Sequence, residues 1–278
     1  MRPNRLTFFA AAAAVLIGFP AESQPANPAS AFTYADLADI ALKAPVAAHV
    51  RIREAIPLRG ERAVGVPPGV TRYYVEAEVL SLIRGERGIP ERVRYLADVP
   101  NDARGRARKL ERKDQYLILA ARVPGRGDEL SLVAPDAQLP YTPARADQLR
   151  AILSAASGAD APPAVTGIGR AFHVPGAIPG ESETQIFLQT ANGDPISLVV
   201  LRRPGQTPRW AVALSEIVDE AAAPPQPDTL LWYRLACTLP PSLPRQSLSE
   251  ADPAHAAAIQ TDYRLVMEGL GPCARNRG

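Results

Sequence analysis

The side chains best suited to chemistry are two cysteines, three histidines and one run of basic residues. Cys237 and Cys273 are the only cysteines, and they are far apart in the sequence. A redox centre usually has the spacing Cys-x-x-Cys, whereas a lone, widely spaced pair in an exported chain is typical of a structural bridge. We therefore predict a Cys237–Cys273 disulfide.

The histidines His49, His173 and His255 are scattered and have no partner at the spacing of a zinc site, so no metal site and no cofactor are expected. The segment Gly180 to Thr184 resembles a nucleophile elbow but lacks its last glycine. Ser-x-x-Lys and phosphate-loop motifs are also missing from the sequence. A hydrolase would need His173 within hydrogen-bond reach of both a serine and a carboxylate, brought together by folding.

Two groups of basic residues are candidate contact surfaces. The possible anion-binding residues are Arg104, Arg106, Arg108, Lys109, Arg112 and Lys113. Such a loop could follow a phosphate backbone or an anionic glycan, but acidic neighbours and the lack of an interleaved aromatic favour a solvated loop. The possible surface contact patch is Arg202, Arg203, Arg209 and Trp210. That patch suits a carbohydrate, and it equally suits a turn with a tryptophan packed beneath it.

The composition is that of a globular chain. The 278 residues are 46% apolar and carry a formal charge of +2, which argues against disorder and against a global field that would recruit nucleic acid or membrane. Sequence-specific binding of nucleic acid is therefore not expected.

Residues 1–23 have the pattern of a secretory signal peptide. Arg2 and Arg5 precede the apolar run from Leu6 to Phe19, and Ala21-Glu22-Ser23 predicts cleavage before Gln24. An uncleaved anchor is the alternative. We expect a periplasmic or secreted protein with no integral membrane span after cleavage.

Apolar periodicity in the first half predicts two helices around a set of strands. Thr33 and Thr142 are expected to cap helices over 34–43 and 143–155. The predicted strands are 46–56, 73–80, 92–97, 115–121 and 129–133. Strict alternation from Tyr73 to Leu80 indicates one wet face, whereas the strand from Gln115 is apolar on both faces and is expected to be central.

The second half has a different order of elements. The predicted strands are 165–174, 183–190, 195–202 and 209–214, joined as an antiparallel meander by turns such as Asn192-Gly193. Residues 229–239 favour a helix capped by Asp228, with a buried strand as the alternative. The last helix is expected to begin at Asp252-Pro253 and end at Gly269.

At this point the N-terminal half resembles the netrin-like, inhibitor-type OB modules of secreted proteins. The matching segments are the leading helix to Pro45, residues 46–52, 75–85 and 89–93, and Asp114 to Leu119. The resemblance implies a small Greek-key barrel. Inhibitors of that group act through an N-terminal cysteine, which this chain lacks there, so inhibition by that route is not implied.

Together these features predict an α+β, mostly β protein: an OB-like small β-barrel followed by a four-stranded antiparallel meander packed with C-terminal helices. The predicted segments are a signal peptide (1–23), a spacer (24–32), a barrel domain (33–156), a linker (157–164) and a disulfide-closed domain (165–278). We expect a non-catalytic binding or scaffolding protein of the cell envelope. Its partner would be an envelope protein or an anionic polymer. The alternatives are an envelope hydrolase with an unrecognised active site, and binding of an anionic glycan or nucleic acid through the basic loop.

Overall fold

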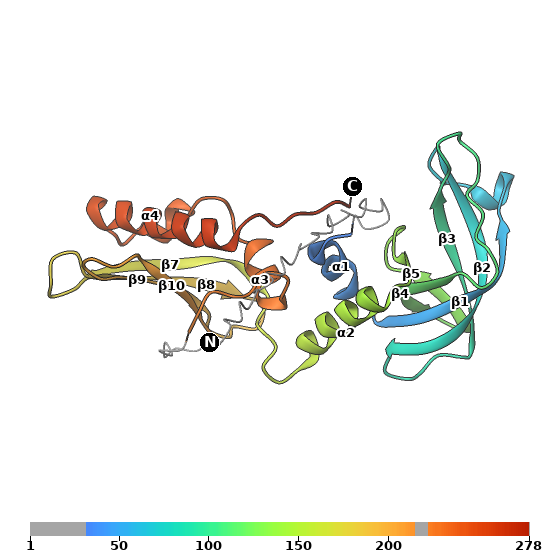
Figure 1. The fold of residues 1–278 in the computed structure, drawn as a ribbon, viewed down its shortest axis with the longest axis horizontal. Coiled ribbons are helices and arrows are strands. Elements are labelled where there is room, and N and C mark those ends of the chain that lie inside the picture. The colour runs from blue at the N-terminus through green and yellow to red at the C-terminus, as the bar shows by residue number, and fades with distance from the viewer. Residues whose placement is uncertain (1–31, 215–221, 278) are drawn as a thin grey trace, which may run out of the picture. The chain divides into compact units, whose positions relative to one another are not determined.

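The computed structural model describes residues 32–214 and 222–277, so the predicted signal peptide and most of the predicted spacer lie outside the described residues. The protein is α+β and mostly β, as predicted: a five-stranded barrel precedes a four-stranded antiparallel sheet that packs with C-terminal helices (Figure 1). Within the described residues, no helix has both the length and the apolar character needed to cross a membrane.

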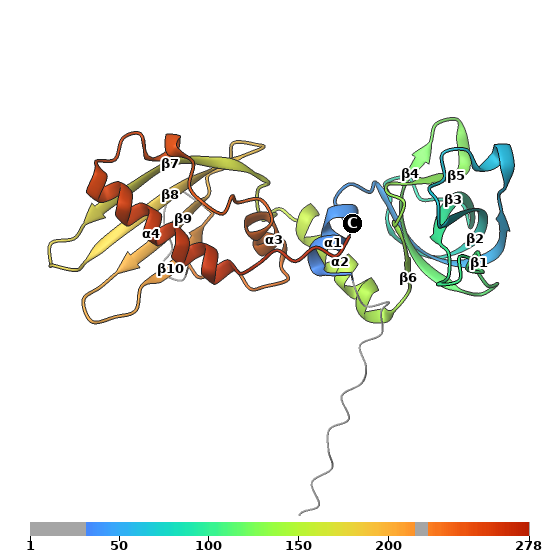
Figure 2. The ribbon, with the colours of Figure 1, turned by 90° about the horizontal axis from the view of Figure 1, so that it is seen from above.

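Five strands form the barrel (Figure 2): β1 (Val46–Pro57), β2 (Val70–Arg84), β3 (Arg92–Pro100), β4 (Gln115–Val123) and β5 (Arg126–Leu132). Their order is β1-β2-β3-β5-β4, and the pairing of β1 with β4 closes the ring. The β3–β5 pair is parallel and the other pairs are antiparallel, so the barrel is mixed. A short strand, β6 (Gln138–Pro140), adds to β4, and a 3₁₀ turn, η2 (Gly60–Ala63), lies between β1 and β2.

Side-chain alternation explains both the barrel interior and the central position of β4. Tyr73, Val75 and Ala77 of β2 are buried inside, as the period of two predicts. In β4, Ile118 belongs to the barrel interior, whereas Leu117 belongs to a second apolar cluster that includes both N-terminal helices. Because both faces of β4 are covered at its centre, residues 117–120 are apolar and buried in succession.

Two helices flank the barrel strands in sequence, α1 (Tyr34–Ala41) and α2 (Pro143–Ser157). Thr33 and Thr142 cap them as predicted, and Thr33 forms a capping box with Asp36. Asp36 is fully buried, and its carboxylate also accepts hydrogen bonds from the backbone amides at 276 and 277. The Arg277 guanidinium contacts Asp136 at 2.7 and 2.8 Å. The C-terminal tail is thereby tied to α1 and to the segment before β6.

The second sheet is the predicted meander, with strand order β10-β9-β8-β7. Its strands are β7 (Val165–Pro175), β8 (Ser182–Thr190), β9 (Ser197–Arg202) and β10 (Arg209–Ala213). The long helix α4 (Pro253–Leu270) lies across one face of this sheet (Figures 1 and 2). Its buried apolar side chains are Ile259, Tyr263, Val266 and Leu270, which is the predicted stripe.

Two predicted helix ends need correction. Gly269 does not end α4; Gly271 does, with φ at 69°, a left-handed conformation that glycine adopts readily. A Cβ at Gly269 would lie 2.5 Å from Trp210 Nε1, so the glycine there allows close packing instead. Residues 230–236 are the helix α3 (Leu230–Ala236), but Thr229 caps it rather than Asp228. A 3₁₀ turn, η3 (Arg245–Leu248), follows α3.

The predicted disulfide is present. It joins Cys237, at the end of α3, to Cys273 beyond α4, with the Cα atoms 5.1 Å apart. Apolar side chains of α1, α2, the second sheet, α3 and α4 belong to one buried cluster, so residues from both predicted domains share a core. The linker at 157–164 stays a prediction.

Candidate functional site

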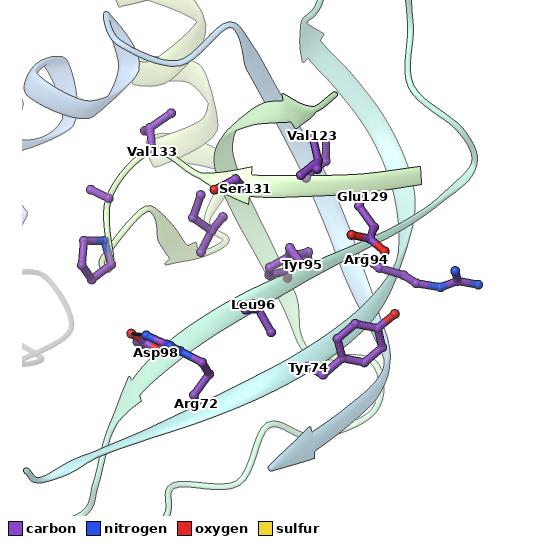
Figure 3. A pocket seen from close by; sticks show the side chains of 14 residues that line it. Arg72, Tyr74, Arg94, Tyr95, Leu96, Asp98, Val123, Glu129, Ser131 and Val133 are labelled. Carbon is purple, nitrogen blue, oxygen red and sulfur yellow. Dashed lines mark hydrogen bonds and ion pairs between the residues drawn. The ribbon is translucent and has the colours of Figure 1, made fainter. Parts of the chain in front are cut away.

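The barrel opens along the seam between β3 and β5. These strands form a single parallel bridge, Arg94 with Glu129, whereas β3 pairs with β2 along its whole length. A groove of about 500 Å³ lies along this seam (Figure 3). Its lining comes from β2, β3, the end of β4, β5 and the segment after β5.

Apolar and aromatic side chains form much of the groove. Tyr74 and Leu96 stand on the outer faces of neighbouring strands, directly opposite each other in the β2–β3 register. Leu96 is 47% exposed, which is unusual for a large apolar residue in the middle of a strand. Val123 and Val133 contribute from the other side of the seam (Figure 3). The groove therefore offers apolar surface to a ligand.

The charged side chains at the groove are already paired with one another. Arg72 forms a bidentate ion pair with Asp98: Nε donates to Oδ1 and Nη2 donates to Oδ2, both at 2.7 Å. Arg94 contacts Asp128 at 2.8 Å and lies 3.8 Å from Glu76. The bidentate Arg72–Asp98 pair is half-buried and well oriented. The Arg94–Asp128 pair is exposed and adds little stability, so a ligand can replace or extend that pair at small cost. The charge at the groove is close to balance.

Tyr95 lies beneath the same groove. Its side chain is 2% exposed and points into the barrel between the outward Arg94 and Leu96. Its phenol oxygen is buried and has no hydrogen-bond partner within residues 32–214 and 222–277. Burial raises the pKa of Tyr95, so the phenol stays protonated and can donate.

The polar groups that line the groove are two arginines, two carboxylates, two tyrosines and one serine. Ser131 is its only hydroxyl besides the two tyrosines, and no histidine or cysteine lines it. In the part of the chain that the structure describes, no group of three or more histidine, cysteine, aspartate or glutamate side chains could hold a metal ion.

The predicted basic loop is divided in the structure. Asp102 accepts hydrogen bonds from the backbone amides of Arg104 and Arg106 and pairs with the Arg106 guanidinium. Lys109 pairs with Glu111 at 3.1 Å, and the backbone carbonyl of Arg108 accepts a bond from Tyr73.

Arg112 and Lys113 have a different environment. They line a small hollow with Arg51, Ile52 and Arg53 of β1. The structure therefore brings Arg112 and Lys113 into this hollow with β1. Lys109 lines a neighbouring hollow that also includes Arg53, and Arg104, Arg106 and Arg108 line neither hollow.

The predicted patch on the second sheet is also divided. Arg202 and Trp210 stand on the face that α4 covers, where Trp210 packs against Gly269. Arg209 pairs with Leu201 in the register and stands on the opposite face, and Arg203 begins the turn between β9 and β10. The four side chains do not form one surface.

A polar network lies beneath α4. Asp262 of α4 is 1% exposed and accepts hydrogen bonds from the Arg202 guanidinium, at 2.8 and 2.5 Å, and from the Thr184 hydroxyl, at 2.5 Å. His173 Nδ1 lies 2.8 Å from the same hydroxyl. Because the Thr184 proton goes to the carboxylate, the hydroxyl must accept from His173, which places the imidazole proton on Nδ1 and leaves Nε2 as a free acceptor.

Burial lowers the pKa of His173, which favours its neutral form. The nearby His255 and Arg202 lower this pKa as well, whereas the carboxylate of Asp262 raises it. Together with Ser182, Glu181 and Arg202, His173 lines an open hollow of about 490 Å³. However, among the described residues His173 bonds to no serine, and the carboxylate is one hydroxyl further away. The arrangement expected of a serine hydrolase is not formed.

The other histidines have ordinary environments. His49 stacks on Tyr141 with the ring centroids 3.7 Å apart and bonds to Gln115. His255 contacts Asp252 at the start of α4.

The sequence patterns did not predict the β3–β5 groove or the buried carboxylate of Asp262. Tyr74 and Leu96 fall on the outward faces of predicted strands, and Arg72 and Asp98 lie one residue beyond the predicted ends of those strands. Only the pairing of β2 with β3 brings the four residues together. Asp262 lies within the apolar stripe of α4, and this break in the stripe was the available signal.

Comparisons with known proteins add no identification. A scan against protein-family models finds no match to this chain, and a search of curated proteins finds none.

Proposed function

We propose that this protein is a non-catalytic binding module of the cell envelope and that its barrel, which we assign to the OB type, holds its ligand in the β3–β5 groove. OB barrels bind ligands on the face formed by strands 2 and 3, flanked by the loops between strands 1 and 2 and between strands 4 and 5. The groove lies against the corresponding strands here, with Tyr74 and Leu96 on that face. This correspondence supports the assignment.

The observation that carries the proposal is the unpaired edge of β3. Within the described residues, β3 has one edge fully paired with β2 and the other paired only at Arg94. Such an edge presents free backbone N–H and C=O groups, which readily accept another strand. The groove beside this edge leaves room for an extended segment, and Leu96 beside it supplies an apolar contact.

The chemistry of the groove favours a polypeptide over a nucleic acid. Its arginines are matched by carboxylates, so it lacks the excess positive charge that tracks phosphates. Stacking along single-stranded nucleic acid needs successive aromatic platforms, and Tyr74 is the only aromatic on this outer face of the groove. Strand addition instead uses main-chain hydrogen bonds for affinity and alternate side-chain pockets for specificity. An extended segment of a partner protein fits these features best.

The setting is part of the same proposal. The predicted signal peptide at 1–23 supports export to the periplasm or beyond, where partners would be envelope proteins. A disulfide is typical of such oxidising compartments.

Panning a phage-displayed library of random peptides on the full protein tests this function. We expect enrichment of peptides with alternating apolar residues, whose binding Leu96→Arg weakens at least tenfold. Leu82→Arg is the matched control, because Leu82 is also an exposed leucine of the barrel, at 38%, but does not line the groove. No enrichment, or equal losses in the two variants, would refute a binding groove at β3.

An envelope hydrolase is the second candidate, and one observation favours it. The Thr184–Asp262 relay holds His173 in the tautomer with Nε2 free, and an open hollow lies beside it. A neutral imidazole oriented in this way can act as a general base toward water. Hydrolysis of a panel of chromogenic esters that His173→Gln abolishes while leaving the fold intact would support this candidate. The absence of hydrolysis across the panel would argue against it.

A further inference from the structure

We infer that the barrel carries a second site, an anion site on β1, that binds a phosphate or sulfate group. The site is the hollow of about 270 Å³ lined by Arg51, Ile52, Arg53, Arg112 and Lys113. It lies outside the β3–β5 groove and shares none of its lining residues, so it does not rest on the proposed function.

Charge is the first observation that carries the site. Four of its five lining side chains are cationic, and within residues 32–214 and 222–277 one carboxylate, Glu78, forms the ion pairs with them. Glu78 is shared by Arg51, at 3.6 Å, and Arg53, at 3.4 Å. Neither Arg112 nor Lys113 forms an ion pair with any described residue. Repulsion among these cations is relieved when an anion enters.

A buried, unpartnered donor is the second observation. The Nε atom of Arg51 is buried and finds no acceptor among the described residues. An arginine nitrogen cannot lose its proton, so this Nε stays a donor without an acceptor, while the Nη2 atom of the same side chain pairs with Glu78 and the side chain is 36% exposed. A tetrahedral oxyanion offers several oxygens and can meet Arg51 and a neighbouring cation together.

The backbone at Lys113 is the third observation. Lys113 has φ at 79°, in the left-handed region that a lysine adopts at a cost. Its amide donates to the carbonyl of Ile52, and the Ile52 amide donates to the carbonyl of Asp114. These two bonds fix the loop against β1 and place the cations of the loop beside those of the strand.

The neighbouring hollow limits the extent of the site. Arg53 and Arg112 line both hollows. The neighbouring hollow adds two cations and three carboxylates: Arg92, Lys109, Glu54, Glu76 and Glu111. Charge is nearly balanced there. The excess of positive charge is therefore confined to the side of Arg51 and Lys113. This suits the binding of one anionic group more than the binding of several consecutive groups of a polymer.

Calorimetry with inorganic phosphate and with short inorganic polyphosphate, at low ionic strength, tests the site. We expect the double variant Arg112→Gln/Lys113→Gln to weaken both ligands at least tenfold. The matched control Arg104→Gln/Arg106→Gln removes the same charge from the same loop, away from the hollow, and should change the affinity less than twofold. Arg51→Gln should also weaken both ligands, because it removes the buried donor.

The two ligands distinguish the source of the anion. Equal affinity per phosphate group indicates a free anion, whereas polyphosphate that binds tenfold more tightly, with the same sensitivity to Arg112 and Lys113, indicates a group on a polymer. Equal losses in the site variant and the control variant would show diffuse attraction to the loop and would overturn the site. No binding of either ligand by the wild-type protein would also overturn it.

Discussion

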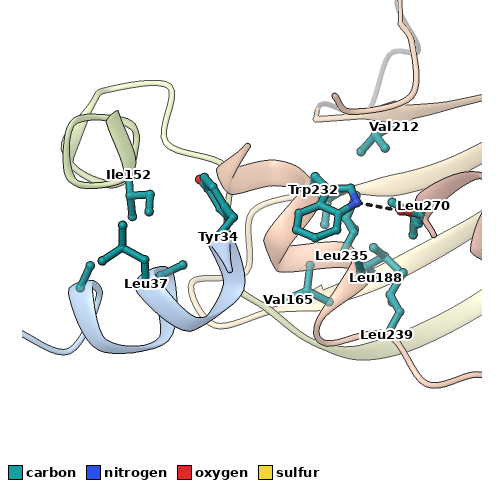
Figure 4. Packing of buried hydrophobic residues seen from close by; sticks show 14 of the residues in the cluster. Tyr34, Leu37, Ile152, Val165, Leu188, Val212, Trp232, Leu235, Leu239 and Leu270 are labelled. Carbon is teal, nitrogen blue, oxygen red and sulfur yellow. Dashed lines mark hydrogen bonds between the residues drawn. The ribbon is translucent and has the colours of Figure 1, made fainter. Parts of the chain in front are cut away.

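The barrel and the second sheet use polar side chains in opposite ways. In the barrel, ion pairs such as Arg72–Asp98 and Arg94–Asp128 lie on the outer surface, and the interior is apolar apart from tyrosine phenols. In the second sheet the main charged contact lies beneath α4, where Asp262 is almost fully buried. Trp232 of α3 likewise donates an internal hydrogen bond, at 2.8 Å, to the carbonyl of Leu270 (Figure 4).

Under the proposed function, this difference separates ligand binding at the barrel from stabilisation of the second sheet. Exposed pairs contribute little to folding, so the barrel surface can exchange its partners for those of a ligand. A buried carboxylate depends on every donor around it, so the network at Asp262 holds α4 in place. The variants below test this division, starting with the largest expected effect.

Asp262→Ala should be the most damaging substitution. It leaves the partly buried Arg202 without its carboxylate and Thr184 without its acceptor, so we expect a loss of about 3–5 kcal/mol in the free energy of unfolding. Glu268→Ala, at an exposed position of the same helix, should change stability by less than about 0.5 kcal/mol. Urea denaturation measures both. Similar, small effects of the two substitutions would show that the network is not structural.

Cys273→Ser should destabilise the second half by a slightly smaller amount. The bridge closes a loop with a sequence separation of 36, for which the chain-entropy model gives about 3–4 kcal/mol. Hydrogen exchange should show that α4 frays at its C-terminal end, while the barrel, which has no cysteine, keeps its protection. Two titratable thiols in the native protein, or an unchanged melting curve for the variant, would contradict this prediction.

Acidification should weaken the protein partly through His173. Burial lowers the pKa of His173 in the folded state, so the unfolded chain takes up a proton first as the pH falls below the ordinary value of 6.5. Stability should therefore fall from pH 7 toward pH 5. His49, whose pKa burial also lowers, adds to this slope from the barrel.

His173→Gln should make the stability of the protein less dependent on pH in this range, because glutamine does not titrate. Denaturation midpoints at pH 5, 6 and 7 give the comparison. A variant with the same dependence on pH as the wild type would show that His173 titrates normally in the folded state.

The smallest effect is expected in the basic loop. Replacing Arg104, Arg106, Arg108 and Lys109 together by glutamine should change the free energy of unfolding by no more than about 1 kcal/mol, because all four side chains are exposed. Thermal melts with circular dichroism measure this change. A larger loss would mean that the loop stabilises the barrel. Exposed charges of the barrel would then contribute to stability, contrary to the difference drawn between the two regions.

Sequence patterns predicted the elements because local rules decide them. The period of two identified the side chains of β2 that face the barrel interior. Thr33 and Thr142 identified the N-terminal caps of α1 and α2. Asn192-Gly193 identified the turn between β8 and β9. The error at Gly269 has a different cause. Whether a glycine ends a helix or allows close packing depends on what lies against it, here Trp210.

The candidate sites could not be predicted in the same way because they depend on strand order. Arg94 and Glu129 meet only because β3 pairs with β5, and the single bridge between them leaves the edge of β3 open. Arg51 and Lys113 meet only because the loop folds back along β1. In both sites, distant segments contribute side chains that are ordinary when taken one at a time.

The central proposal is that a partner adds a strand to the open edge of β3. A scan of single backbone N-methylations along a peptide selected on the protein tests it most directly, with affinity as the readout. Because successive amides of a strand point in opposite directions, we predict losses of at least tenfold at every second position and little change between them. Tolerance of N-methylation at every position would show that side chains alone hold the peptide and would contradict strand addition.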